Sequence, residues 1–145
     1  MSKENHELNK QRSNQILDGR PELGITINEM AQIRKDYERE MGDLEKERIS
    51  LTNKLNEAKK KGDVVRVVGS LIDFSSREIR LHEAYLLDIS KFKLKVEDDV
   101  ELKELIELNN SQFILDEEET AKKDLILAQE NLERLNKLNL AAKNE

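Results

Sequence analysis

The sequence predicts an all-α protein: an elongated antiparallel coiled-coil hairpin with an additional C-terminal helix, forming either a three-helix or an oligomeric bundle. Two observations lead to this fold class. Of the 145 residues, 39% are charged and 3% are aromatic, and there are one proline and five glycines. This composition suits long helices and lacks the bulky side chains of a compact core. The apolar residues also recur at alternating spacings of three and four, which is typical of helices that pack side by side.

The first 25 residues are polar and show no apolar periodicity, and they include Pro21 and two of the five glycines. We interpret residues 1–25 as a flexible N-terminal arm. The arm is followed by Thr26 and Glu29. A Thr followed three residues later by Glu matches the capping box, in which each side chain accepts from the backbone amide of the other residue. A helix is therefore expected to begin at residue 26.

A seven-residue apolar repeat starts at Ile27 and continues to the middle of the chain. Such a repeat predicts a coiled-coil seam. Arg34 and Arg48 occupy two of its positions. A charged group in a dry seam either reaches solvent over its aliphatic stem or meets a carboxylate of the partner helix. The predicted seam residues of this helix are Met30, Tyr37, Met41, Leu44, Leu51 and Leu55.

The stretch KKKGDVVRVV, residues 59–68, allows three interpretations: a phosphate-binding loop, a buried strand or the tip of a helical hairpin. One glycine is too little for a phosphate cradle, and Asp63 would occupy the amides that an anion needs. A strand is excluded because the helical apolar spacing continues to Val96. Three lysines before Gly62 suit the end of a helix. The sequence therefore predicts an antiparallel hairpin over residues 26–96 with its tip at 59–63. The seam of its second helix comprises Val68, Ile72, Ile79 and Leu86.

Residues 97–115 are expected to form a short helix or an irregular connector. The alternation in KFKLKVE, residues 91–97, leaves open a small β-hairpin that turns at Asp98 and Asp99. The favoured alternative is a short helix that ends near Leu108, with Asp98 and Glu101 as its capping pair.

The C-terminal helix is expected over residues 116–145, with four carboxylates in its first turn, where the helix dipole favours negative charge. Its small seam residues, Ala121, Ala128 and Ala142, allow a partner helix to approach closely. The larger seam residues are Leu125, Leu132, Leu135 and Asn139, and the asparagine is of the kind that selects register. The hairpin, a second copy and a different protein all stay open as the partner of this helix.

The charge distribution and the sequence motifs limit the classes of function that are possible. The formal net charge is −6, and residues 96–145 carry 14 acidic and 6 basic side chains. This acidic third would repel phosphates, so nucleic acid is not the expected partner. Residues 19–26 imitate the spacing of a phosphate-binding loop, but Ile25 stands where the lysine must be. His82 has no second histidine at metal-ligand spacing and is expected to be a partly buried seam residue. We therefore expect no catalytic residue, no cofactor and no metal ligand.

The function expected from these observations is non-enzymatic: a coiled-coil structural or adaptor protein that acts through helix–helix association. The alternative is a small acidic inhibitor that mimics nucleic acid and blocks a basic site on another protein. The second hairpin helix carries more apolar surface than one partner covers, because Val67, Phe74 and Leu81 repeat beside its seam. The expected partner is therefore a protein: a second copy, most simply in a dimer, or a heterologous helix. The N-terminus has no apolar signal segment and no run of roughly 20 apolar residues follows. We expect no membrane contact and a cytoplasmic location or an intracellularly assembled particle.

Overall fold

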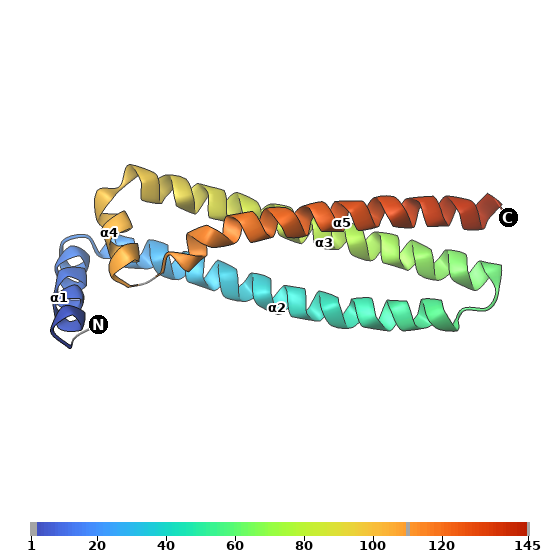
Figure 1. Cartoon of the computed structure of the whole chain (residues 1–145), viewed down its shortest axis with the longest axis horizontal. Helices are drawn as coiled ribbons and strands as arrows, with labels where there is room; N and C mark the ends of the chain where they lie inside the picture. Colours follow the sequence, from blue (N-terminus) through green and yellow to red (C-terminus); the bar gives the residue numbers. More distant parts are fainter. Residues whose placement is uncertain (1–2, 110, 145) are drawn as a thin grey trace.

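A computed structural model describes residues 3–109 and 111–144 of the chain. Within these ranges all regular secondary structure is helical and no strand occurs, so the all-α fold class is confirmed. Figure 1 shows an elongated molecule in which the long helices follow the long axis and the shorter ones lie at one end. The helices, in chain order, are α1 (Lys3–Gly19), α2 (Pro21–Glu57), α3 (Lys61–Asp98), α4 (Val100–Leu108) and α5 (Phe113–Asn144).

Helix α3 is central, because it packs against both α2 and α5 along its length. It runs antiparallel to α2: Tyr37 of α2 stacks on Tyr85, while Arg48, further along α2, bonds to the earlier residue Glu78 of α3. Figure 1 shows that α5 also runs opposite to α3, so that the C-terminus lies near the tip where α2 and α3 connect. The long helices therefore alternate up, down and up.

The N-terminal segment differs from the expected flexible arm, because residues 3–19 form helix α1. Ile16 of α1 is buried in the main apolar cluster, which accounts for the position of this helix. Helix α2 then begins at Pro21, and the expected start at Thr26 is wrong. Proline suits the first helical position because its ring fixes φ and it has no amide to leave unpaired. The Thr26 hydroxyl accordingly donates to the carbonyl oxygen of Glu22, at 3.0 Å, in place of capping.

The hairpin tip lies at residues 58–60, close to its expected place, but its geometry differs. Gly62 belongs to α3 and closes no helix. Helix α2 ends because Ala58 adopts an extended backbone, φ −69° and ψ 123°, and its amide donates to the carbonyl of Leu55 at 3.2 Å. Asp63 lies in the first turn of α3, where it bonds to Arg66. Lys60, the residue before α3, is also extended, with φ −98° and ψ 144°.

The connector after α3 is the short helix α4, so the alternative β-hairpin over residues 91–103 is wrong: its first strand, residues 91–97, continues α3. Helix α4 ends at Leu108 as expected, but its cap is Asp99, whose carboxylate accepts from the amide of Leu102 at 3.2 Å. Asp98 is the last residue of α3 and cannot also cap α4. Helix α5 begins at Phe113, three residues before the expected start.

Burial is uneven along the molecule. The main apolar cluster lies at the end where all helices of the described chain meet. In contrast, no side chain of α2 after Met30 and none of α5 after Ala128 is buried. Helix α3 stays buried near the tip, at Val68 and Leu71. The outer helices are therefore only partly covered over their tip halves. The buried members of the main cluster are Ile16, Leu23, Met30, Tyr85, Ile89, Phe92, Val96, Leu102, Leu105, Ile106, Ile114 and Ala121.

Candidate functional site

The predicted seam residues all lie on helix faces that are at least partly covered. Met30 and Val68 are buried, at 2% and 0% exposure. Because none of the predicted seam residues is exposed, the heptad pattern identifies the inward faces. Their part in association with another molecule stays a prediction. The half-buried seam residues are Tyr37, Met41, Leu44, Leu51, Leu55, Ile72, Ile79, Leu86, Leu125, Leu132, Leu135 and Asn139.

The small seam residues of α5 bring it close to α3. Ala121 and Ala128 are 3% and 1% exposed. A methyl side chain leaves the partner backbone room to approach. Further toward the C-terminus, the side-chain oxygen of Asn139 is buried and has no hydrogen-bond partner in the described part of the chain. An unpaired buried oxygen destabilises the fold by roughly 1–3 kcal/mol. The tip half of α5 thus combines incomplete apolar burial with an unsatisfied polar atom.

A polar layer joins the three long helices at one level. The rings of Tyr37 and Tyr85 stack at a centroid distance of 3.9 Å and an interplanar angle of 8°. The Tyr37 hydroxyl and Nδ1 of His82 share a hydrogen bond of 2.8 Å. The Tyr85 hydroxyl donates to Glu117 of α5, and the same carboxylate accepts from Arg34 of α2. The layer therefore fixes the relative position of α2, α3 and α5.

Burial sets the protonation of this layer. It lowers the pKa of His82 below the ordinary 6.5 and raises the pKa of Tyr37 to about 12. It also raises the pKa of Tyr85, and the hydrogen bond to Glu117 adds to that effect. At neutral pH the imidazole is neutral and both phenols are protonated. These groups suit a structural hydrogen-bond layer.

Both seam arginines of α2, Arg34 and Arg48, meet carboxylates from another helix, which is one of the two alternatives that the sequence leaves open. Arg34 pairs with Glu117 of α5. Arg48 pairs with Glu78 of α3, and its guanidinium lies 5.6 Å from the ring centroid of Phe74. Glu78 is 4% exposed. A buried carboxylate without its partner is costly, so Arg48 holds α2 and α3 in one register.

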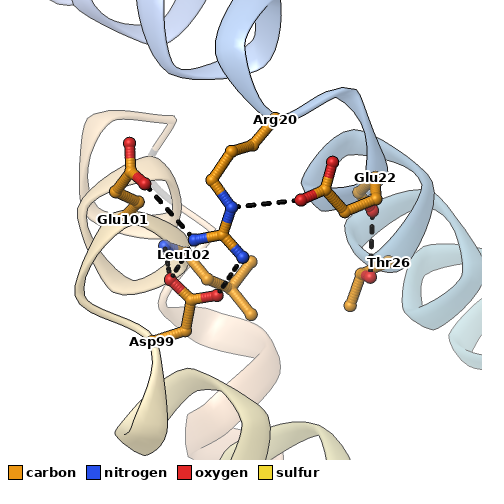
Figure 2. Close-up of polar contacts among 6 residues, drawn as sticks. All are labelled: Arg20, Glu22, Thr26, Asp99, Glu101 and Leu102. Carbon is orange, nitrogen blue, oxygen red and sulfur yellow. Dashed lines mark hydrogen bonds and ion pairs between the residues drawn. The ribbon is translucent and has the colours of Figure 1, made fainter.

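A further ion cluster lies at the end of the molecule away from the α2–α3 tip. No pattern in the sequence predicts it. Figure 2 shows Arg20 between four oxygen atoms. It donates to both carboxylate oxygens of Asp99, at 2.9 and 2.8 Å, to Glu101 at 3.3 Å and to Glu22 at 3.1 Å. The Asp99 carboxylate also accepts from the Leu102 amide. Arg20 lies between α1 and α2, whereas Asp99 lies between α3 and α4. One guanidinium therefore joins two connections that are far apart in the sequence.

A second ion pair supports the same end of the molecule. Arg12 of α1 donates to both carboxylate oxygens of Glu104 on α4, at 2.8 and 3.0 Å. Hydrogen bonds from Arg12 lower the pKa of Glu104, and those from Arg20 lower the pKa of Asp99. Both carboxylates are consequently charged at neutral pH. These contacts hold α1 and α4 together over the main apolar cluster.

The described residues contain no group of three or more histidine and carboxylate side chains placed to hold a metal ion. In the same residues, no helix combines the length and the apolar character that crossing a membrane requires. No protein-family model, curated protein or solved structure matches this chain.

Proposed function

We propose that the protein is a non-enzymatic structural or adaptor protein that acts through helix–helix association. The observation that carries this proposal is the partial burial of the tip halves of α2 and α5. Both helices keep a regular apolar seam there, yet neither has a buried side chain beyond Met30 and Ala128, respectively. Incompletely covered apolar stripes commonly mark interfaces. A partner helix would complete their burial.

A second copy is the partner that we propose, most simply in a two-fold dimer. A groove of about 280 Å³ lies between α2 and α5, and its lining includes Met41, Asp124, Leu127 and Asn131. Leu127 is 58% exposed. The groove and the exposed Leu127 favour a helical partner on this side of the molecule.

Sedimentation equilibrium over a hundredfold concentration range tests self-association. We expect the mass to rise from 16.9 kDa toward twice that value. Leu127→Glu should hold the mass at the monomer value because it places a charge in the apolar contact. Leu8→Glu is the matched control, because Leu8 is similarly exposed, at 60%, but lies on α1. A wild-type mass that stays at 16.9 kDa throughout would refute the dimer and leave a heterologous partner.

The acidic inhibitor is the weaker candidate. Several carboxylates of the C-terminal third already pair inside the chain: Glu117 with Arg34, Glu118 with Lys122, and Glu104 with Arg12. Paired carboxylates present less free negative charge to a basic site. Salt discriminates the two candidates, because association through apolar seams should persist at 0.5 M salt, whereas exposed charges are then screened over roughly 4 Å.

A further inference from the structure

A continuous groove follows the α2–α3 pair, and all of its lining residues come from these two helices. It consists of three hollows of about 120, 210 and 290 Å³. The first two share Ile33 and Asp88, and the last two share Glu40 and Leu81. The groove between α2 and α5 described above involves other faces of these helices. The α2–α3 groove is therefore a separate surface.

The floor of the α2–α3 groove is apolar and long enough to hold a short helix. Ile33, Leu44 and Leu81 line it and are half-buried, so each leaves apolar surface open to solvent. From Met30 to Leu44, α2 rises about 21 Å, at 1.5 Å per residue. This length matches about four turns of a helix laid along the groove. Helix-in-groove recognition uses apolar anchors at such spacing.

The rim of the α2–α3 groove is acidic along its two larger hollows, whereas Lys91 and Lys95 line the smallest one. Asp36, Glu40, Asp43 and Glu47 follow one another on α2 at spacings of four, three and four, and Asp88 faces them from α3. Like charges at these spacings destabilise a helix. Glu47 is neutralised by Arg77. In the part of the chain that the structure describes, Glu40, Asp43 and Asp88 have no ion pair or side-chain hydrogen bond. No ion pair within the described residues thus offsets their repulsion.

We infer that the α2–α3 groove binds a basic amphipathic helix of another protein, about four turns long. The apolar stripe of that helix would lie on Ile33, Leu44 and Leu81, and its lysine or arginine side chains would meet Glu40, Asp43 and Asp88. A second copy fits this groove poorly, because pairing α2 with its own copy would bring the two acidic rims together. The inference therefore goes beyond the proposed self-association: it concerns a different face and a partner of opposite charge.

The test uses a fluorescein-labelled 18-residue synthetic peptide with one leucine stripe and lysines elsewhere, titrated with the full chain and followed by fluorescence anisotropy. One comparison peptide carries glutamates in place of the lysines, and another has the lysine peptide's composition in scrambled order. The lysine peptide should bind. The glutamate peptide should not, and the scrambled peptide should bind at least tenfold more weakly, because it lacks the stripe that the groove floor contacts.

Two triple variants test whether the lysine peptide binds at the α2–α3 groove. The rim variant Glu40→Gln, Asp43→Asn and Asp88→Asn should weaken binding of the lysine peptide at least tenfold. The control variant Asp18→Asn, Glu107→Gln and Glu130→Gln removes the same charge from exposed positions on α1, α4 and α5, and it should change affinity less than twofold.

Folding does not confound the comparison, since the rim variant removes only repelling charges and should melt no lower than the wild type. Failure of the lysine peptide to bind would overturn the inference, as would equal weakening by both triple variants or equal binding of the scrambled peptide. Each of these results would mean that no specific groove contact exists. Sedimentation of the chain without peptide reports on self-association separately. If the chain is a monomer and still binds the lysine peptide, the proposed dimer is refuted and the inferred binding to the α2–α3 groove stands.

Discussion

The guanidinium of Arg20 donates to both carboxylate oxygens of Asp99, at 2.9 and 2.8 Å, across 79 positions of sequence. Each of the two residues is the single residue between two helices, α1 and α2 for Arg20, α3 and α4 for Asp99. Figure 2 shows the two connections facing each other through this pair. The pair therefore fixes the directions in which α1 and α4 leave the long helices. It thereby keeps these two short helices in place over the main apolar cluster.

Replacing Arg20 should lower the melting temperature. Arg20→Ala removes all bonds to Asp99, Glu101 and Glu22, whereas Arg20→Lys keeps the charge but not the two parallel bonds, so its melting temperature should be intermediate. Thermal unfolding followed by circular dichroism measures both. Arg39→Ala is the control, because Arg39 is 68% exposed and reaches only Asp36, at 3.7 Å. Equal effects of Arg20→Ala and Arg39→Ala would contradict the role given to Arg20.

Asp99 has two roles that substitutions can separate. Asn is as good an N-cap as Asp, so Asp99→Asn should lose the charge pair with Arg20 and keep the bond to the Leu102 amide. Asp99→Ala loses both, and it should be less stable than Asp99→Asn by about 1 kcal/mol, the usual value of a cap. Urea unfolding of the two variants gives the difference directly. Identical stabilities would show that the cap contributes nothing.

Close packing of α5 on α3 should make Ala128 intolerant of a larger side chain. Ala128 is 1% exposed. Ala128→Leu should therefore destabilise the protein by about 1–3 kcal/mol through overpacking. Ala141 is an exposed alanine of the same helix, and Ala141→Leu should change stability by less than about 0.5 kcal/mol. Denaturant unfolding compares the two. A neutral Ala128→Leu would mean that α5 has room to move away from α3.

The apolar side chains of α2 should contribute unequally to the free energy of unfolding along the helix. Met30 is 2% exposed, so Met30→Ala should cost about 2–5 kcal/mol. Leu44 and Leu51 are half-buried. Alanine at either position should cost about 1 kcal/mol, less than a closed seam would require, because the side chain already contacts water. Urea unfolding at low protein concentration measures these values for the single chain. Equal costs at Met30 and Leu44 would contradict the uneven burial.

The helical fold could be predicted because composition and heptad spacing are local properties of the sequence. Helix α1 could not, because its place depends on the burial of Ile16 among residues of other helices. Pro21 is a local signal of a helix start, but the capping-box pattern at Thr26 indicates a later one. No local sequence pattern predicts the Arg20–Asp99 pair, because the two residues are 79 positions apart. The acidic rim has no clear signal either, because the nine acidic side chains of α2 are interspersed with six lysines and arginines along the sequence.

Acidification should destabilise the protein through His82. Burial is the main cause of its lowered pKa; Arg48 acts in the same direction, and Glu78 and Asp124 oppose it. The unfolded chain therefore binds a proton near pH 6.5 that the folded chain does not. Stability is full above that pH and falls as the pH drops toward the lowered pKa, with a slope of up to about 1.4 kcal/mol per pH unit.

The carboxylates of Asp99 and Glu104 contribute at lower pH, because arginine partners depress their pKa values and their stabilisation is lost only as the pH falls through those values. Urea unfolding at pH 7.5, 6.5 and 5.5 therefore isolates His82. The wild type should lose stability across this range, and His82→Gln, which has no titrating group, should lose less. Parallel pH profiles for the two proteins would mean that the Tyr37–His82 hydrogen bond admits a protonated imidazole without cost, with the Tyr37 oxygen acting as its acceptor.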